Sequence, residues 1–134
     1  MPRIYITSVF VDDLAKALDF YTNTLGFTAK VDLDLGGARW LTVVGDDPDG
    51  TQLLLEPDQH PAAAAYKKAL VADGIPATSF QVEDVEKTRT ELEAKGVSIV
   101  SGPVSFGPNT FIVIDDTCGN LIQLIQGPVD GAAQ

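Results

Sequence analysis

The chain has 134 residues, in which 19 acidic side chains outnumber 9 basic ones for a net charge of -10, with one histidine and one cysteine. A chain of this length folds as one domain, or as two small modules that share a core. A single cysteine excludes an intramolecular disulfide framework and argues against a Cys/His zinc site. The few lysines and arginines argue against nucleic acid and anionic membranes as partners, because both are bound mainly through positive charge.

The start of the sequence and its hydropathy predict a soluble, cytoplasmic protein. Residues 1–13 contain one arginine and no apolar run of signal-peptide length. No segment approaches the roughly 18 consecutive apolar residues that a membrane span requires. Disorder is expected only in the tail, residues 127–134, which is rich in small and turn-forming residues.

The first half of the chain predicts the order strand, helix and three strands. Residues 3–11 are rich in β-branched and aromatic residues, and Asp12-Asp13 then supply oxygens that cap a helix. Apolar residues recur at helical spacing from Leu14 to Leu25, and Gly26 ends the helix. Three extended stretches follow, at residues 27–33, 38–44 and 51–56.

The second half repeats this pattern about seventy residues later, so that Gly96 corresponds to Gly26 and Gly119 to Gly50. Strands are expected at residues 77–82, 97–100, 110–114 and 120–125, and Glu83-Asp84 supply the helix cap. A repeat preserved in helix stops and turn glycines indicates the same supersecondary unit twice. Between the halves, a helix is expected from Pro61 to Gly74. The predicted organisation is a single domain, 1–134, with a first module (3–56), a linking helix (57–76), a second module (77–126) and the tail.

Two stretches carry a resemblance to a known family. VFVDDLAKALDFYTNTLGF and DDTCGNLIQLIQ resemble the signature regions of the vicinal oxygen chelate superfamily, which includes glyoxalase I, extradiol dioxygenases and bleomycin-resistance proteins. The resemblance covers essentially the whole chain. It implies an α+β fold with two tandem βαβββ modules, an open cup-shaped mixed sheet with the helices outside, and a homodimer.

Strand alternation then predicts which side chains line the cup, because successive side chains point to opposite faces. The more apolar parity, which includes Val9, Leu41 and Leu55, is assigned to the helix side. The opposite parity mixes aromatic and polar residues, as ligand sites do. From it we predict the ligand-binding residues Phe10, Trp40, Gln52, Glu56, Ser79, Asn109, Phe111 and Gln123.

The resemblance also implies where a divalent metal would be held. The corresponding positions here are Ile6, Leu54, Ala77 and Gln123, and three of these four side chains cannot ligate a metal. The prediction is therefore no cofactor and no metal site. The alternative is a divalent metal held by Glu56 and Gln123 with further ligands. His60 is predicted to lie at the start of the linking helix, and the aspartates of GDDPDG to form a hairpin turn.

Two functions remain open, and the sequence does not decide whether the protein is an enzyme. The first is a metal-free protein of the bleomycin-resistance type that sequesters an aromatic or cationic small molecule, with Trp40 stacking on it. The alternative is a glyoxalase- or dioxygenase-like lyase or isomerase with a non-standard site that uses Glu56 as a general base. Glu56 is equally compatible with a water-exposed carboxylate at a strand end, and Trp40 with a core or dimer contact.

Overall fold

A computed structural model of the chain describes residues 1–127, which fall into two compact units, the first Met1–Lys67 and the second beginning at Lys68. The boundary lies inside α2 (Pro61–Ala72), the predicted linking helix. Apart from Gly127, the predicted tail lies outside the described residues. The grouping of both modules into one domain, and of their sheets into one cup, stays a prediction.

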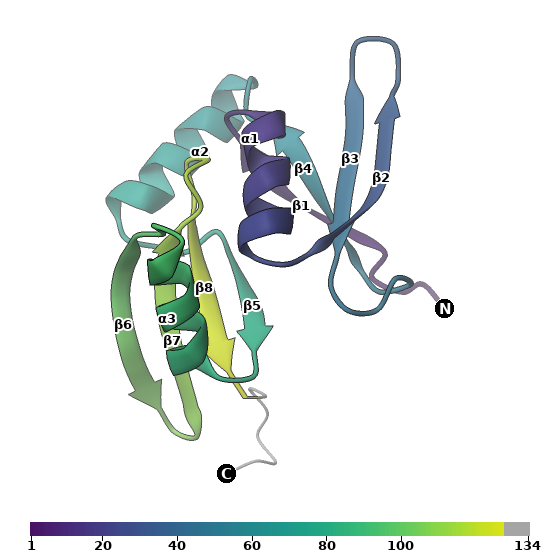
Figure 1. The fold of residues 1–134 in the computed structure, drawn as a ribbon. Helices are drawn as coiled ribbons and strands as arrows, with labels where there is room; N and C mark the ends of the chain where they lie inside the picture. The colour runs from purple at the N-terminus through teal and green to yellow at the C-terminus, as the bar shows by residue number, and fades with distance from the viewer. Residues whose placement is uncertain (128–134) are drawn as a thin grey trace. The chain divides into compact units, whose positions relative to one another are not determined.

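The first unit has the predicted βαβββ order. Its elements are β1 (Ile6–Val11), α1 (Leu14–Asp19), η1 (Phe20–Thr24), β2 (Thr28–Asp34), β3 (Arg39–Val44) and β4 (Gln52–Pro57). The sheet order is β1-β4-β3-β2, with β1 parallel to β4 and the other pairs antiparallel. Helix α1 packs against β4 (Figure 1). One face of the sheet is therefore covered within the unit.

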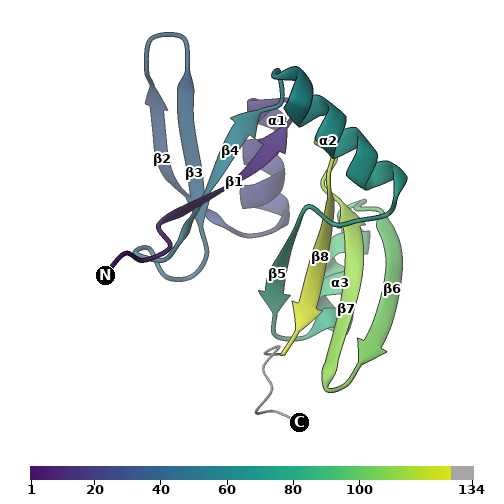
Figure 2. The same cartoon turned by 180° about the vertical axis from the view of Figure 1, so that it is seen from behind.

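The second unit repeats this arrangement. Its elements are β5 (Thr78–Val82), α3 (Val85–Ala94), β6 (Ile99–Phe106), β7 (Asn109–Asp115) and β8 (Leu121–Gln126). The strand order β5-β8-β7-β6 and the parallel pair β5–β8 match those of the first unit. Helix α3 packs against β6, β7 and β8 (Figure 2). The predicted α+β class and the internal repeat are confirmed.

The first helix is shorter than the sequence pattern predicts. Asp13 caps α1, as expected, by accepting a hydrogen bond from the Lys16 backbone N–H at 3.0 Å. The regular helix ends at Asp19, and the π-helical turn η1 follows instead of continuing the α-helix to residue 25. The wider turn accommodates two adjacent bulky side chains, Phe20 and Tyr21, which are both buried and pack edge to face.

Two strand boundaries differ from the predicted ones. β1 begins at Ile6 rather than at residue 3, and β6 extends over 99–106 rather than 97–100. β6 contains Gly102-Pro103, a pair that normally interrupts a strand, but it is an edge strand and its ladder with β7 shifts register there. Gly102 is required at this position, since its φ is +95° and a Cβ would lie 2.7 Å from the Phe111 carbonyl oxygen.

The predicted helix-side parity forms the core of each unit. In the first unit Val9, Val11, Leu41, Val43, Leu53 and Leu55 are all buried, and in the second unit Ile112, Ile114 and Leu124 are buried. Phe80 and Val82 are only half-buried. None of the helices in the described part of the chain is long and apolar enough to cross a membrane.

Candidate functional site

The four ligand-binding residues predicted in the first unit lie on the face opposite the core residues. Phe10 is the register partner of Glu56 across β1 and β4, and Gln52 lies on the same face four register positions away. Trp40 has the same parity on β3 and is 37 % exposed. The structure thus places these residues on one sheet face, while their role in binding stays a prediction.

Gln52 is engaged within the protein. Its Oε1 atom accepts a hydrogen bond of 2.7 Å from the Thr42 hydroxyl, and both side chains are buried. The Thr42 hydroxyl therefore satisfies the buried Gln52 carbonyl oxygen within the protein.

Thr42→Val is expected to lower the free energy of unfolding by about 1–2 kcal/mol, because it leaves the buried Gln52 carbonyl oxygen without this donor. Urea unfolding followed by Trp40 fluorescence measures the change. The matched variant Thr42→Val/Gln52→Leu replaces both partners by apolar groups and should recover most of the loss. Equal stability of Thr42→Val and the native protein would contradict this assignment.

The strands β3 and β4 separate at one end of the first sheet. Their ladder contains only two register pairs, Thr42↔Leu54 and Val43↔Leu53. The equivalent strands of the second unit, β7 and β8, are paired over six positions. The β2–β3 hairpin therefore diverges from β4 towards its Gly36-Gly37 tip, as Figure 1 shows.

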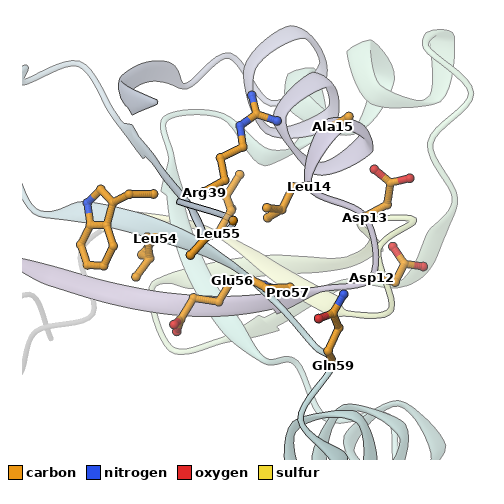
Figure 3. A pocket seen from close by; sticks show the side chains of 13 residues that line it. Asp12, Asp13, Leu14, Ala15, Arg39, Leu54, Leu55, Glu56, Pro57 and Gln59 are labelled. Atoms are coloured by element: carbon orange, nitrogen blue, oxygen red, sulfur yellow. The ribbon is translucent and has the colours of Figure 1, made fainter. Parts of the chain in front are cut away.

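A cavity of about 750 Å³ opens where the strands separate. It is bounded by the start of β3, the end of β4 and the residues that begin α1 (Figure 3). Trp40, Leu14 and Leu55 contribute apolar surface, while Glu56 and Arg39 contribute charge. Of the predicted site residues, Trp40 and Glu56 are the two that line this cavity. The mixture of apolar walls and a few polar groups is typical of small-molecule sites.

The carboxylates around the cavity differ in whether they have a partner within the protein. Asp12 pairs with Lys16 at 3.1 Å, and Asp13 is used as the helix cap. The half-buried Glu56 carboxylate makes no hydrogen bond or ion pair with any described residue. An unpaired and partly desolvated carboxylate attracts a cation more strongly than one that is already paired.

Arg39 is held by Asp32 on the neighbouring strand. The Nε and Nη2 atoms of Arg39 donate to the two carboxylate oxygens of Asp32, each at 2.8 Å. These hydrogen bonds lower the pKa of Asp32 and raise the pKa of Arg39. The ion pair keeps the guanidinium in one orientation at the cavity.

Sequence reasoning missed Arg39 and the residues that start α1. A signal for the ion pair was available, since Asp32 stands four residues before Gly36-Gly37 and Arg39 two residues after it. In the hairpin Asp34 is the register partner of Arg39, so this spacing makes Asp32 and Arg39 diagonal neighbours of opposite charge on adjacent strands. The separation of β3 from β4 has no counterpart in the sequence pattern.

The predicted ligand-binding residues of the second unit all have contacts within that unit. Ser79 donates a hydrogen bond of 2.9 Å to Gln123 Oε1, and the buried Asn109 donates to the Gln126 backbone carbonyl at 3.0 Å. Phe111 packs edge to face on the exposed Phe106. Ser79 and Gln123 share a face as predicted, and Phe111 lies on that face as the register partner of Ile125.

The side chains at the family's metal positions do not fit a metal. Ile6, Leu54 and Ala77 have no donor atom, and Gln123 Oε1 already accepts from Ser79. Among the described residues, no group of three or more His, Cys, Asp or Glu side chains is arranged to hold a metal ion. His60 is exposed and lies just before α2, where its Nδ1 accepts from the Ala62 backbone N–H at 3.0 Å. Its predicted place at the helix boundary is confirmed.

Comparison with known proteins places the chain among relatives over nearly its full length. It is 50% identical over 125 residues to the protein YurT of Bacillus subtilis (strain 168), covering 92% of this chain and 98% of YurT. It is 26% identical to a lactoylglutathione lyase of Neisseria meningitidis, covering 92% and 90% of the two chains.

A solved structure and a family profile agree with these relatives. The structure of TnmS3, an antibiotic binding protein from Streptomyces sp. CB03234, superposes with a TM-score of 0.76 at 27% identity, covering 96% of this chain and 98% of that chain. The profile of the Glyoxalase/Bleomycin resistance protein/Dioxygenase superfamily matches residues 3–124. With the repeated βαβββ units, this match means that the chain belongs to the Glyoxalase/Bleomycin resistance protein/Dioxygenase superfamily.

Proposed function

We propose that this protein binds and sequesters a cationic aromatic small molecule, without a metal, in the cavity between β3 and β4. The observation that carries the proposal is Glu56, a half-buried residue that lines a cavity of about 750 Å³ and whose carboxylate has no partner among the described residues. Trp40 lines the same cavity and is partly exposed. A protonated amine or aromatic cation would pair with Glu56 and stack on the indole.

Charge and similarity both support this function. The net charge of -10 attracts cations over long range and raises their local concentration. The similarity to TnmS3, which is an antibiotic binding protein, supports a role in binding small molecules. The absence of donor atoms at Ile6, Leu54 and Ala77 supports a metal-free site. From the family resemblance we further propose that the protein acts as a cytoplasmic homodimer.

A second candidate function is an isomerase or lyase in which Glu56 acts as a general base. The similarity to a lactoylglutathione lyase and the unpaired state of Glu56 favour this candidate. The four family metal positions lack a donor set, so such a reaction would depend on the carboxylate alone. Metal analysis of the purified protein tests the metal-free site, and a stoichiometric divalent metal would overturn it.

Glu56→Gln is expected to weaken the binding of the planar cation N-methylquinolinium about tenfold, because a charged hydrogen-bonded contact contributes on the order of 1.5–3 kcal/mol. Quenching of Trp40 fluorescence and isothermal titration calorimetry measure the affinity. Quinoline, which is neutral at pH 8, is the matched ligand and should bind the native protein and the variant equally.

Glu91→Gln is the matched control variant, because it removes one exposed carboxylate from the second unit and changes the net charge equally. It should leave the affinity for N-methylquinolinium unchanged. Failure of N-methylquinolinium to bind the native protein, or equal weakening by both variants, would overturn the proposed binding site.

A further inference from the structure

We infer that the ligand of this cavity has two polar ends, a protonated amine that contacts Glu56 and a neutral carbonyl oxygen that accepts from Arg39, joined by an apolar spacer. The inference rests on the proposed function and deepens it by naming the ligand class. It assigns to Arg39 a role in specificity that is separate from the charge recognition by Glu56.

Arg39 lines the cavity, and one nitrogen of its guanidinium has no partner among the described residues. Nε and Nη2 are both used by Asp32, whereas Nη1 makes no hydrogen bond with any described residue. Because Asp32 holds the planar group by two bonds, little side-chain freedom is lost when Nη1 donates to a ligand. Arg39 is therefore a preorganised donor.

A neutral acceptor suits this donor better than an anion. The charge of Arg39 is already balanced by Asp32, and Asp34 lines an adjoining hollow together with both residues. A carboxylate placed here would be repelled by these aspartates and by the net charge of -10. An amide or ketone oxygen accepts the hydrogen bond without that repulsion.

The two polar groups approach the cavity from opposite sides. Arg39 has the parity of the core residue Leu41, and Glu56 has the opposite parity, next to Leu55. Figure 3 shows the side chains of Arg39 and Glu56 extending in opposite directions, with Leu55 between them. A ligand that contacts both must pass between the separated strands β3 and β4, and its middle must be apolar to match Leu54, Leu55 and Leu14.

A series of linear ω-amino amides, from aminobutanamide to aminododecanamide, tests this inference by calorimetry. Each is compared with the alkylamine of the same chain length. We expect Arg39→Met to weaken the best-binding amino amide by about threefold to tenfold, as for one hydrogen bond. The same variant should leave the affinity for the alkylamine unchanged, and the affinity should peak at one chain length.

Two further variants keep the result interpretable. Arg39→Lys retains a positive charge beside Asp32 but loses the planar group, and it should behave as Arg39→Met does towards the amino amides. Arg3→Met removes a positive charge from an exposed residue outside the cavity and should have no effect on either series.

Failure of this inference differs from failure of the proposed function. If Glu56→Gln weakens the binding of all the amines while Arg39→Met affects amino amides and alkylamines equally, the carbonyl contact is wrong and the cation site stands. If no amine depends on Glu56, both proposals are wrong. Tighter binding of the corresponding ω-amino acid than of the amino amide would also overturn the neutral acceptor.

Discussion

Asp116→Ala is expected to destabilise the second unit by about 3–5 kcal/mol, because three hydrogen bonds to one buried carboxylate are lost together. Asp116 is fully buried in the turn between β7 and β8. Its Oδ1 atom accepts from the backbone N–H groups of Cys118 at 2.7 Å and Asn120 at 3.0 Å, and its Oδ2 atom accepts from Asn120 Nδ2 at 2.9 Å.

The repeat offers a matched control for this substitution. Asp47 occupies the corresponding position in the turn between β3 and β4, but it is exposed and accepts only from the Asp49 backbone N–H at 2.9 Å. Asp47→Ala should cost less than about 1 kcal/mol. Urea unfolding followed by far-UV circular dichroism measures both variants, and equal midpoints would contradict the role of Asp116.

Asp58→Ala is expected to destabilise the first unit by about 3 kcal/mol, because breaking a buried ion pair leaves one charge in a poorly solvated place. The Lys67 ammonium of α2 lies 2.8 Å from Asp58 Oδ2, and the Lys67 side chain is only 7% exposed. Trp40, the only tryptophan, lies in the same unit, so its fluorescence during urea unfolding reports this loss.

The double variant Asp58→Ala/Lys67→Met distinguishes two contributions to the lost stability, the cost of keeping the Lys67 charge buried and the loss of the contact between the two side chains. Replacement of both partners should recover much of the lost stability, because an apolar side chain carries no desolvation penalty. Glu93→Ala breaks an exposed helical pair with Arg89 and should cost less than about 1 kcal/mol. If Asp58→Ala costs no more than Glu93→Ala, the pair does not behave as a buried one.

The sequence by itself determined the repeated βαβββ order and the helix caps at Asp13 and Asp84, both of which the structure confirms. It also determined most of the strand residues that form the core, because alternation assigns a side chain to one face, although Phe80 and Val82 are only half-buried. That rule placed Trp40 and Glu56 opposite the core, where they line the cavity. These features depend on the spacing of apolar and capping residues along the chain, which can be read from the amino-acid sequence alone.

Only the tertiary structure decided that β3 separates from β4 after two register pairs, while β7 and β8 stay paired over six. The cavity exists because of this separation. Periodicity encodes the face of a side chain but not the length of a ladder, which depends on packing between distant residues. The same reason separates Asp47 from Asp116: they correspond in the sequence repeat, but only the second is buried by its neighbours in the fold.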